Sequence, residues 1–249
     1  MTATSINNTN EHIYSPEDIL TMLDSLLREP APFWNNFYTD KSKNIPFFCE
    51  FPDENLVSYF NNKTISPKKA LELGCGPGRN AIYMTKQGCE VTAVDISDES
   101  INWARERAAD ANLDIQFICH SIFNLAINEP TYDFVYDSGC FHHIPPHRRF
   151  DYLNLLEKAL QPNGYFALTC FSSESDCGAD ISDWEVYKSR SMHGGLAYSE
   201  EKLRRIFSKS FDIIEVRPMR EDVPNTMTGA GFLWTALFKR HHRDVSTGT

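Results

Sequence analysis

The sequence has little positive charge for its length. Its 249 residues include 24 Lys or Arg against 34 Asp or Glu, which gives a formal net charge of −10. Nucleic acids and anionic membranes are bound mainly through clustered positive charge, so this deficit argues against both as general partners. The sequence also lacks an apolar run long enough to cross a bilayer, and its polar N-terminus has no signal-like hydrophobic stretch. We therefore expect no nucleic-acid partner and no membrane association.

Patterned cysteines are also absent. The seven cysteines are an odd number, are scattered, and form no C-x-x-C pair. This usage predicts reduced thiols in a cytoplasmic protein rather than a disulfide framework.

His143 and His147 have the i, i+4 spacing of helical zinc sites, but Pro145 and Pro146 lie between them and no third ligand is near. No metal site is predicted.

The length fits one α/β domain, residues 1–249. A helix is predicted to begin at Ser15-Pro16-Glu17-Asp18, where Ser supplies an N-cap and Pro suits the first helical position. We expect the following regions within the chain: a disordered start over 1–13, a lid-like or helical segment over 14–62, a core over 63–240, an insertion on the substrate side over 171–198, and a disordered tail over 240–249.

Short apolar strands alternate with helices from residue 69 onward. This alternation predicts an α/β fold with a seven-stranded, mostly parallel sheet and helices on both faces. The last two strands are joined by a loop without a helix, so the last strand is expected to be antiparallel. The predicted strands are 69–73, 90–95, 114–119, 132–137, 163–171, 212–218 and 231–239, and the predicted helices are 53–61, 79–87, 98–110, 146–160 and 199–208.

A glycine-rich turn joins the first of these strands to its helix. Gly74, Gly76 and Gly78 come directly before the predicted start of a helix at Arg79. Glycine lets the backbone turn sharply and approach a ligand closely, and a helix N-terminus favours an anionic group. Asp95 ends the next strand, where a carboxylate accepts hydrogen bonds from the hydroxyls of a ribose. Together these features predict a nucleotide-type cofactor at the carboxyl ends of the strands.

Two residues separate this loop from a dinucleotide-binding loop. The dinucleotide pattern G-x-G-x-x-G requires a third glycine where this chain has Arg79. Glu72 stands just before the first glycine, where an acid suits a ligand with an ammonium group and is unfavourable beside a pyrophosphate. An NAD-dependent oxidoreductase is therefore a weaker alternative.

The segments Glu72–Gly78 (ELGCGPG) and Val94–Ser97 (VDIS) resemble the first two motifs of the class I S-adenosylmethionine-dependent methyltransferases. The segments 132–137 and 160–166 resemble the fourth and fifth, and the resemblance is strongest over 65–170. It implies a Rossmann-like fold, S-adenosylmethionine as cofactor, and methyl transfer. The acid that usually follows strand three is missing, because residues 119–123 read Cys-His-Ser-Ile-Phe. The resemblance implies cofactor contacts from Trp34, Tyr38, Glu72, Gly74, Gly76, Asn80, Asp95 and Ile96, with backbone groups of Ser121 and Ile122 facing the adenine.

A cluster of reactive side chains follows strand four. His142 is the preferred general base, since imidazole titrates near neutral pH; the alternative, that it only makes hydrogen bonds within the turn, stays open. Asp137 is the second catalytic candidate and is expected to contact the cofactor's amino-acid part or a substrate amine. Arg148 or Arg149 is a candidate for binding an anionic substrate, although a solvated helix start is the preferred interpretation.

Aromatic residues crowd the N-terminal segment. Trp34, Phe37, Tyr38, Phe47 and Phe48 form either core or a lid, and aromatic faces attract a cation such as a sulfonium. This segment resembles that of the small-molecule thiol, thiopurine, halide and tellurite methyltransferases. Long segments at 171–198 and 219–231 are expected to shape a substrate pocket.

The resulting prediction is in-line transfer of a methyl group from S-adenosylmethionine to a small-molecule substrate. The nucleophile is a thiol, another soft group or a hydroxyl, and the protein is a monomer or homodimer. Two alternatives stay open, a non-catalytic S-adenosylmethionine-binding subunit and an NAD-dependent oxidoreductase.

Overall fold

One sheet of seven strands forms the centre of the structure, in the order β3-β2-β1-β4-β5-β7-β6. β7 runs antiparallel to both β5 and β6, and the pairs among β1 to β5 are parallel. The predicted fold class, including the antiparallel last strand, is confirmed. The strands are β1 (Lys69–Leu73), β2 (Glu90–Asp95), β3 (Gln116–Cys119), β4 (Tyr132–Ser138), β5 (Leu160–Phe171), β6 (Phe211–Pro218) and β7 (Leu233–Arg240).

The computed structural model describes residues 12–241. The predicted disorder over 1–13 and 240–249 lies mostly outside the described residues, although Arg240 belongs to β7. Within residues 12–241 no helix is long and apolar enough to cross a membrane. The described helices are α1 (Pro16–Ser25), α2 (Pro30–Tyr38), α3 (Glu54–Asn61), α4 (Arg79–Lys86), α5 (Asp98–Asp110), α6 (Arg149–Ala159), α7 (Asp183–Ser189) and α8 (Glu200–Phe207), with 3-10 turns η1 (Pro46–Phe48), η2 (Ile122–Asn124), η3 (Phe141–His143) and η4 (Pro146–Arg148).

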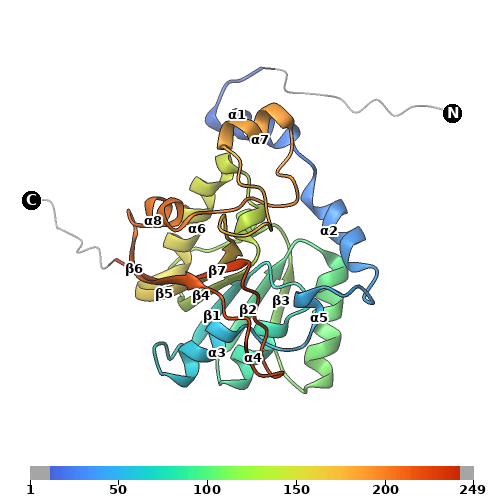
Figure 1. Cartoon of the computed structure of the whole chain (residues 1–249), viewed down its shortest axis with the longest axis vertical. Coiled ribbons are helices and arrows are strands. Elements are labelled where there is room, and N and C mark those ends of the chain that lie inside the picture. Colours follow the sequence, from blue (N-terminus) through green and yellow to red (C-terminus); the bar gives the residue numbers. More distant parts are fainter. Residues whose placement is uncertain (1–11, 242–249) are drawn as a thin grey trace, which may run out of the picture.

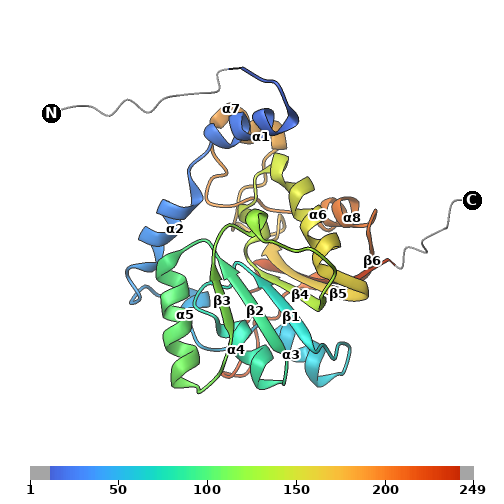
Figure 2. The ribbon, with the colours of Figure 1, turned by 180° about the vertical axis from the view of Figure 1, so that it is seen from behind.

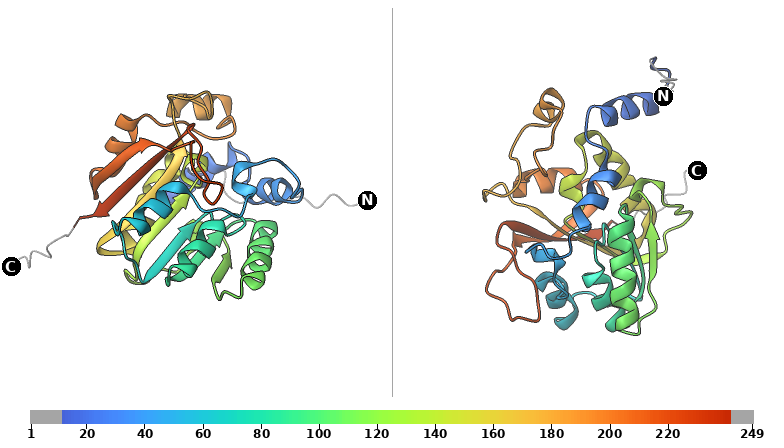
Figure 3. Two further views of the ribbon diagram at one scale, coloured as in Figure 1. Left: turned by 60° about the horizontal axis from the view of Figure 1, so that its bottom comes forward. Right: turned by 90° about the vertical axis from the view of Figure 1, so that its right-hand side faces the viewer.

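Helices cover both faces of the sheet (Figures 1 and 3), and a separate apolar core lies on each face. Leu71 and Leu73 of β1 face one core with α6 and α8, while Ala70 faces the other with α3, α4 and α5. This alternation follows from the period of two along a strand. Because both faces of the sheet are covered, a ligand can reach it only at the ends of the strands. A binding site is therefore expected there.

Several helices begin at a serine whose side chain accepts a backbone hydrogen bond. Ser15 forms a capping box with Asp18, as its sequence predicts, and Ser97, Ser182 and Ser199 cap α5, α7 and α8. Two helices have no counterpart among the sequence predictions, α2 in the aromatic segment and α7 in the insertion. α6 begins at Arg149 rather than at residue 146, since Pro145 and Pro146 start a separate 3-10 turn.

α1 and α7 both lie at one end of the molecule, beyond the sheet (Figure 1). In the side view of Figure 3 they stand as two separate arms. α2 packs beside α5, as seen from behind in Figure 2. The N-terminal segment and the insertion therefore both extend the molecule at the end where the cavity described below is found.

Candidate functional site

A cavity of about 1490 Å³ lies at the carboxyl ends of the strands. β1 and β4 are neighbours in the centre of the sheet, and the strand order reverses between them. Open α/β sheets bind ligands at this point because the loops on its two sides diverge. The cavity is lined by the predicted cofactor residues and by one of the two catalytic candidates: Trp34, Tyr38, Glu72, Gly74, Gly76, Asn80, Asp95, Ile96, Ser121, Ile122 and His142.

The glycine loop needs glycine at its first two positions. Gly74 and Gly76 have φ angles of +66° and +51°, in the left-handed region. A Cβ atom on Gly74 would lie 2.6 Å from the Cβ of Cys140, and one on Gly76 would lie 3.0 Å from the Tyr38 hydroxyl. The loop is therefore held closely between the turn after β4 and the aromatic segment.

Asp95 fixes this loop from the end of β2. Its Oδ2 accepts the N–H of Gly76 at 2.8 Å, and its Oδ1 accepts the N–H of Ser97 at 2.9 Å. Burial raises the pKa of Asp95, and these backbone hydrogen bonds oppose that shift. Each carboxylate oxygen keeps a second lone pair, so the side chain retains acceptors for ribose hydroxyls.

Glu72 is a buried acid of the cavity wall with one unpaired oxygen. Its side chain is 1% exposed, and its Oε2 has no hydrogen-bond partner among the described residues. Burial raises the pKa of Glu72 to about 8, although Arg79 lowers it. An unpaired buried carboxylate is costly, so this atom fits a cationic ligand group.

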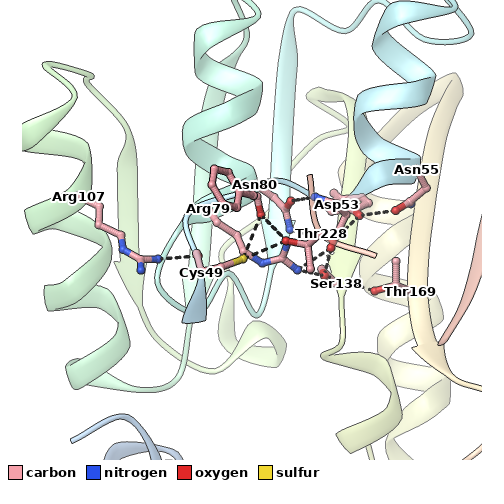
Figure 4. Close-up of polar contacts among 11 residues, drawn as sticks. Cys49, Asp53, Asn55, Arg79, Asn80, Arg107, Ser138, Thr169 and Thr228 are labelled. Atoms are coloured by element: carbon pink, nitrogen blue, oxygen red, sulfur yellow. Dashed lines mark hydrogen bonds and ion pairs between the residues drawn. The ribbon is translucent and has the colours of Figure 1, made fainter. Parts of the chain in front are cut away.

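A buried polar network supports the loop from behind (Figure 4). Asp53 pairs with Arg79 at 2.6 Å, and its Oδ2 accepts from Ser138 at 2.6 Å and from Tyr136 at 2.8 Å. The amide group of Asn80 hydrogen-bonds the Asp53 carboxylate at 3.1 Å and the Asp53 backbone N–H at 3.0 Å. Asp53 was not among the sequence candidates, and its position at the start of a predicted helix gave no sign of this role.

The side of the cavity expected to hold the adenine is formed by the ends of β2 and β3. Ile96 and Ser121 lie there, with Ile122 in η2. The hydroxyl of Ser121 accepts the N–H of Phe123 at 3.4 Å and so caps η2. Contacts of the adenine with backbone groups of Ser121 and Ile122 stay a prediction.

The aromatic segment divides into two sets. Trp34, Tyr38 and Phe47 line the cavity, and the ring of Trp34 meets that of His143 edge-on at 4.7 Å. Phe48 is buried and lies behind Tyr38, with their rings stacked at 5.5 Å. The segment thus forms both a cavity wall and a small core that supports it.

Asp137 lies below the cavity surface. Its Oδ1 accepts the N–H groups of Cys140 and Phe141 at 2.8 and 3.2 Å, and its Oδ2 accepts the hydroxyl of Tyr152 at 2.6 Å. The residue is fully buried and does not line the cavity. This geometry does not suit the catalytic role expected for Asp137; its carboxylate organises the turn that carries His142.

His142 lies on the cavity wall, and one hydrogen bond fixes its ring. The backbone N–H of Phe171 donates to His142 Nδ1 at 3.3 Å, and the two rings stack at 3.8 Å. Burial, with a smaller effect of His143, lowers the pKa of His142 well below its usual value. Because Nδ1 accepts, the proton of the neutral ring is on Nε2, which then donates and cannot accept a proton. This arrangement is unfavourable to the general-base role expected for His142.

The two arginines after the turn are not a solvated helix start. Arg148 contacts Asp24 of α1 at 2.5 Å and Asp151 at 2.9 Å. Arg149 is buried, where it pairs with Asp183 at 2.6 Å and contacts Tyr198. Both guanidinium groups are therefore held by protein carboxylates, and the preferred sequence interpretation was wrong.

The cavity continues past the ends of β5 and β7. Both segments expected to shape a pocket contribute to it, Cys177, Gly178 and Met192 from 171–198 and Met219, Thr228 and Ala230 from 219–231. Phe171, Phe232 and Leu233 complete this half. None of these side chains carries a charge, in contrast to the half beside Glu72 and Asp95.

Comparison with known proteins agrees with the position of the site. Residues 70–164 match a family described as a methyltransferase domain. Over 227 residues the chain is 26% identical to the probable S-adenosyl-L-methionine-dependent methyltransferase TehB of Haemophilus influenzae, which covers 80% of this chain and 77% of that protein. Residues 70–164 form a methyltransferase domain, and over most of its length the chain resembles an S-adenosylmethionine-dependent methyltransferase.

Solved structures share the fold of this methyltransferase. The crystal structure of TehB from Haemophilus influenzae has a TM-score of 0.57 at 22% identity, covering 76% of this chain and 62% of that one. The Burkholderia thailandensis 1,6-didemethyltoxoflavin-N1-methyltransferase, solved with 1,6-didemethyltoxoflavin and S-adenosylhomocysteine, has a TM-score of 0.60 at 20% identity, covering 94% of this chain and 93% of that one. The predicted family, its cofactor and its reaction, methyl transfer to a small-molecule nucleophile, are confirmed at this level.

The cavity of the methyltransferase fits the cofactor that its family uses. The unpaired Oε2 of Glu72 suits the ammonium group of S-adenosylmethionine, and the glycine loop leaves space that any Cβ on Gly76 would reduce. Asp95 offers acceptors at the end of β2, one strand away. In residues 12–241 no group of three His, Cys, Asp or Glu side chains is placed to hold a metal ion.

Proposed function

We propose that this methyltransferase acts on a small, uncharged nucleophile held in the apolar half of the cavity. The cofactor occupies the other half, with Glu72 at its ammonium group, Gly74 and Gly76 beneath it, and Asp95 at its ribose. Ile96, Ser121 and Ile122 face the adenine. Trp34 and Tyr38 close over it, and Asn80 acts indirectly by fixing Asp53.

The observation that carries the proposal is the buried, unpaired carboxylate oxygen of Glu72 beside the glycine loop. A pyrophosphate at this place would bring negative charge against a carboxylate, whereas an ammonium group would neutralise it. The same observation disfavours a nicotinamide dinucleotide.

When bound, the cofactor supplies an electrophilic methyl group on a sulfonium. The protein's own contribution is position and the exclusion of water. Trp34 and Tyr38 come from α2, while Phe171 and Met192 come from the other end of the cavity. The place where the cofactor half and the apolar half meet is thus enclosed by elements that are distant in sequence. A nucleophile confined there is desolvated and held near the reacting carbon.

The surroundings favour an acceptor that needs little help from a base. Burial and the charge of Arg28 lower the pKa of His143 to about 3, and His142 presents a donor nitrogen. A thiol, or an N–H or O–H group of appreciable acidity, reacts under these conditions more readily than an aliphatic alcohol.

Calorimetric titration tests the cofactor assignment. We expect S-adenosylhomocysteine to bind and NADH not to bind, and Glu72→Gln to weaken S-adenosylhomocysteine by about tenfold or more, since one charged hydrogen bond is lost. Binding of NADH instead would overturn the proposal. Mass spectrometry on a panel of thiols, phenols and heterocycles separates catalysis from the non-catalytic alternative, for which no acceptor gains a methyl group.

A further inference from the structure

Two adjacent imidazoles on the cavity wall have ring nitrogens that make no hydrogen bond. The rings of His142 and His143 lie 4.3 Å apart, and both line the cavity. Within residues 12–241, Nε2 of His142 and both ring nitrogens of His143 have no hydrogen-bond partner, while Nδ1 of His142 accepts from Phe171. These ring nitrogens are open to the cavity, so they are free to form hydrogen bonds with a ligand bound there.

The hydrogen-bonding character of the pair follows from its surroundings. His142 is limited to donation from Nε2, as its contact with Phe171 requires. Burial lowers the pKa of both rings, and Arg28 further opposes a proton on His143. A neutral His143 carries one donor nitrogen and one acceptor nitrogen. The pair therefore offers a donor on His142 and both a donor and an acceptor on His143.

The groups around the pair restrict what can bind there. Phe171 stacks on His142, and Trp34 meets His143 edge-on. A Cβ on Gly195 would lie 3.1 Å from ring carbons of both histidines, so the insertion is packed against their edges. Aromatic walls with donor and acceptor nitrogens favour a flat, neutral molecule with complementary polar atoms on one edge.

We propose that His142 and His143 together recognise a neutral heteroaromatic acceptor that has an N–H group next to a carbonyl, as in a lactam. The carbonyl accepts the Nε2–H of His142, and the N–H donates to His143. This assignment rests on the proposed function, because the acceptor must lie beside the bound cofactor. It narrows the acceptor to one chemical class.

The test uses the full chain saturated with S-adenosylhomocysteine and two probes, quinolin-2-one and N-methylquinolin-2-one. Only the first has an N–H group, and both have the carbonyl. In ligand-observed NMR titrations we expect quinolin-2-one to bind about tenfold more tightly. His143→Phe should bring the two dissociation constants together, whereas His142→Phe should weaken both probes by a similar factor and preserve their ratio.

His241→Phe is the matched control, because this histidine lies at the far end of β7 and contacts Asp212 outside the cavity. It should leave both probes unaffected. Equal binding of the two probes to the wild type, no binding of either, or a ratio that survives His143→Phe would each overturn the inference. The affinity for S-adenosylhomocysteine is measured on the wild type and on every variant, which keeps the two proposals apart. If the wild type did not bind S-adenosylhomocysteine, the proposed function would be refuted rather than this inference.

Discussion

Glu72 combines almost complete burial with a carboxylate oxygen that has no partner in the described chain. In the free protein burial raises its pKa to about 8, so near neutral pH the carboxyl group holds a proton. A cationic ligand group favours the ionised form and displaces that proton. The cost of burying this acid is therefore coupled to ligand binding.

This coupling predicts pH-dependent cofactor binding. Between pH 6 and 7.5 the affinity for S-adenosylhomocysteine should rise by up to about tenfold per pH unit, with release of about one proton on binding. Calorimetry in two buffers of different ionisation enthalpy measures the released proton. Asp137, whose pKa burial raises to about 7, titrates in the same range, so Glu72→Gln is the necessary comparison. Proton release that persists unchanged in this variant would assign the effect elsewhere.

His142 yields a second prediction at the residue scale. Its pKa is lowered by burial and its Nδ1 is occupied by Phe171, so it should not titrate as a base during turnover. With both substrates saturating, the rate should show no inflection between pH 6 and 7 that disappears in His142→Gln. An inflection near pH 6.5 in the wild type that is absent from the variant would restore the general-base role.

Asp53 joins three elements, since it precedes α3, pairs with Arg79 at the start of α4, and accepts from Tyr136 and Ser138 of β4. Removing its charge leaves the buried guanidinium unpaired. Asp53→Asn should therefore lower the free energy of unfolding by about 3–5 kcal/mol. Urea unfolding measures this loss. The double variant with Arg79→Met should lose less than the sum of the two single variants, and additive losses would show that the pair is not coupled.

The helix α1 is held by polar contacts rather than by a core. It has no buried residue, and Asp24 contacts His147 at 2.8 Å and Arg148 at 2.5 Å. The same histidine contacts Tyr187 of α7 at 2.8 Å, so one turn of the core holds both arms. A partly exposed ion pair contributes little to global stability, typically below about 1 kcal/mol. We infer that this cluster controls the position of α1 more than the stability of the fold.

Asp24→Asn should separate these two effects. Hydrogen exchange in α1 should become several-fold faster, while the free energy of unfolding changes by less than about 1 kcal/mol. Hydrogen exchange followed by mass spectrometry measures the first and urea unfolding the second. Asp110→Asn at the end of α5 is the matched control and should change neither. Unchanged exchange in α1 would mean that other contacts hold the helix.

Elements with a local sequence pattern were predictable and elements without one were not. The strands were predictable because short apolar segments alternate with helices along the chain. The cap at Ser15 was predictable because its side chain accepts a hydrogen bond from a residue only three positions away. α2 was missed although its aromatic residues share one face, because the helix is only nine residues long, begins in a Pro-Ala-Pro run and has no capping side chain. The pairing of Asp53 with Arg79 spans 26 residues and arises only when α3 and α4 meet at the sheet. Most of the predicted cavity residues could be found because they lie at the carboxyl ends of neighbouring strands. The tautomer of His142 could not, because it depends on Phe171, a contact distant in sequence that no local pattern encodes.

At the scale of the whole molecule, two buried acids make stability depend on pH. Burial raises the pKa of Glu72 to about 8 and of Asp137 to about 7, above their unfolded values. A raised folded pKa gives stability that is full below the unfolded pKa and is lost as the pH rises through the folded one. The free protein should therefore lose stability between pH 5 and pH 8.5, by roughly a few kcal/mol.

Thermal unfolding with and without S-adenosylhomocysteine tests this whole-molecule effect. The free protein should melt at a falling temperature from pH 5 to pH 8.5, and Glu72→Gln should flatten part of that fall. Ligand should raise the melting temperature more at pH 8 than at pH 6, because it binds the ionised carboxylate and its stabilisation grows with affinity. Self-repulsion from the net charge of −10 also grows with pH, but it acts equally on the wild type and on any variant of the same charge. Since Glu72→Gln removes one negative charge, Glu99→Gln on the surface of α5 is the control, and a slope flattened equally by both would attribute the fall to net charge rather than to the buried acid.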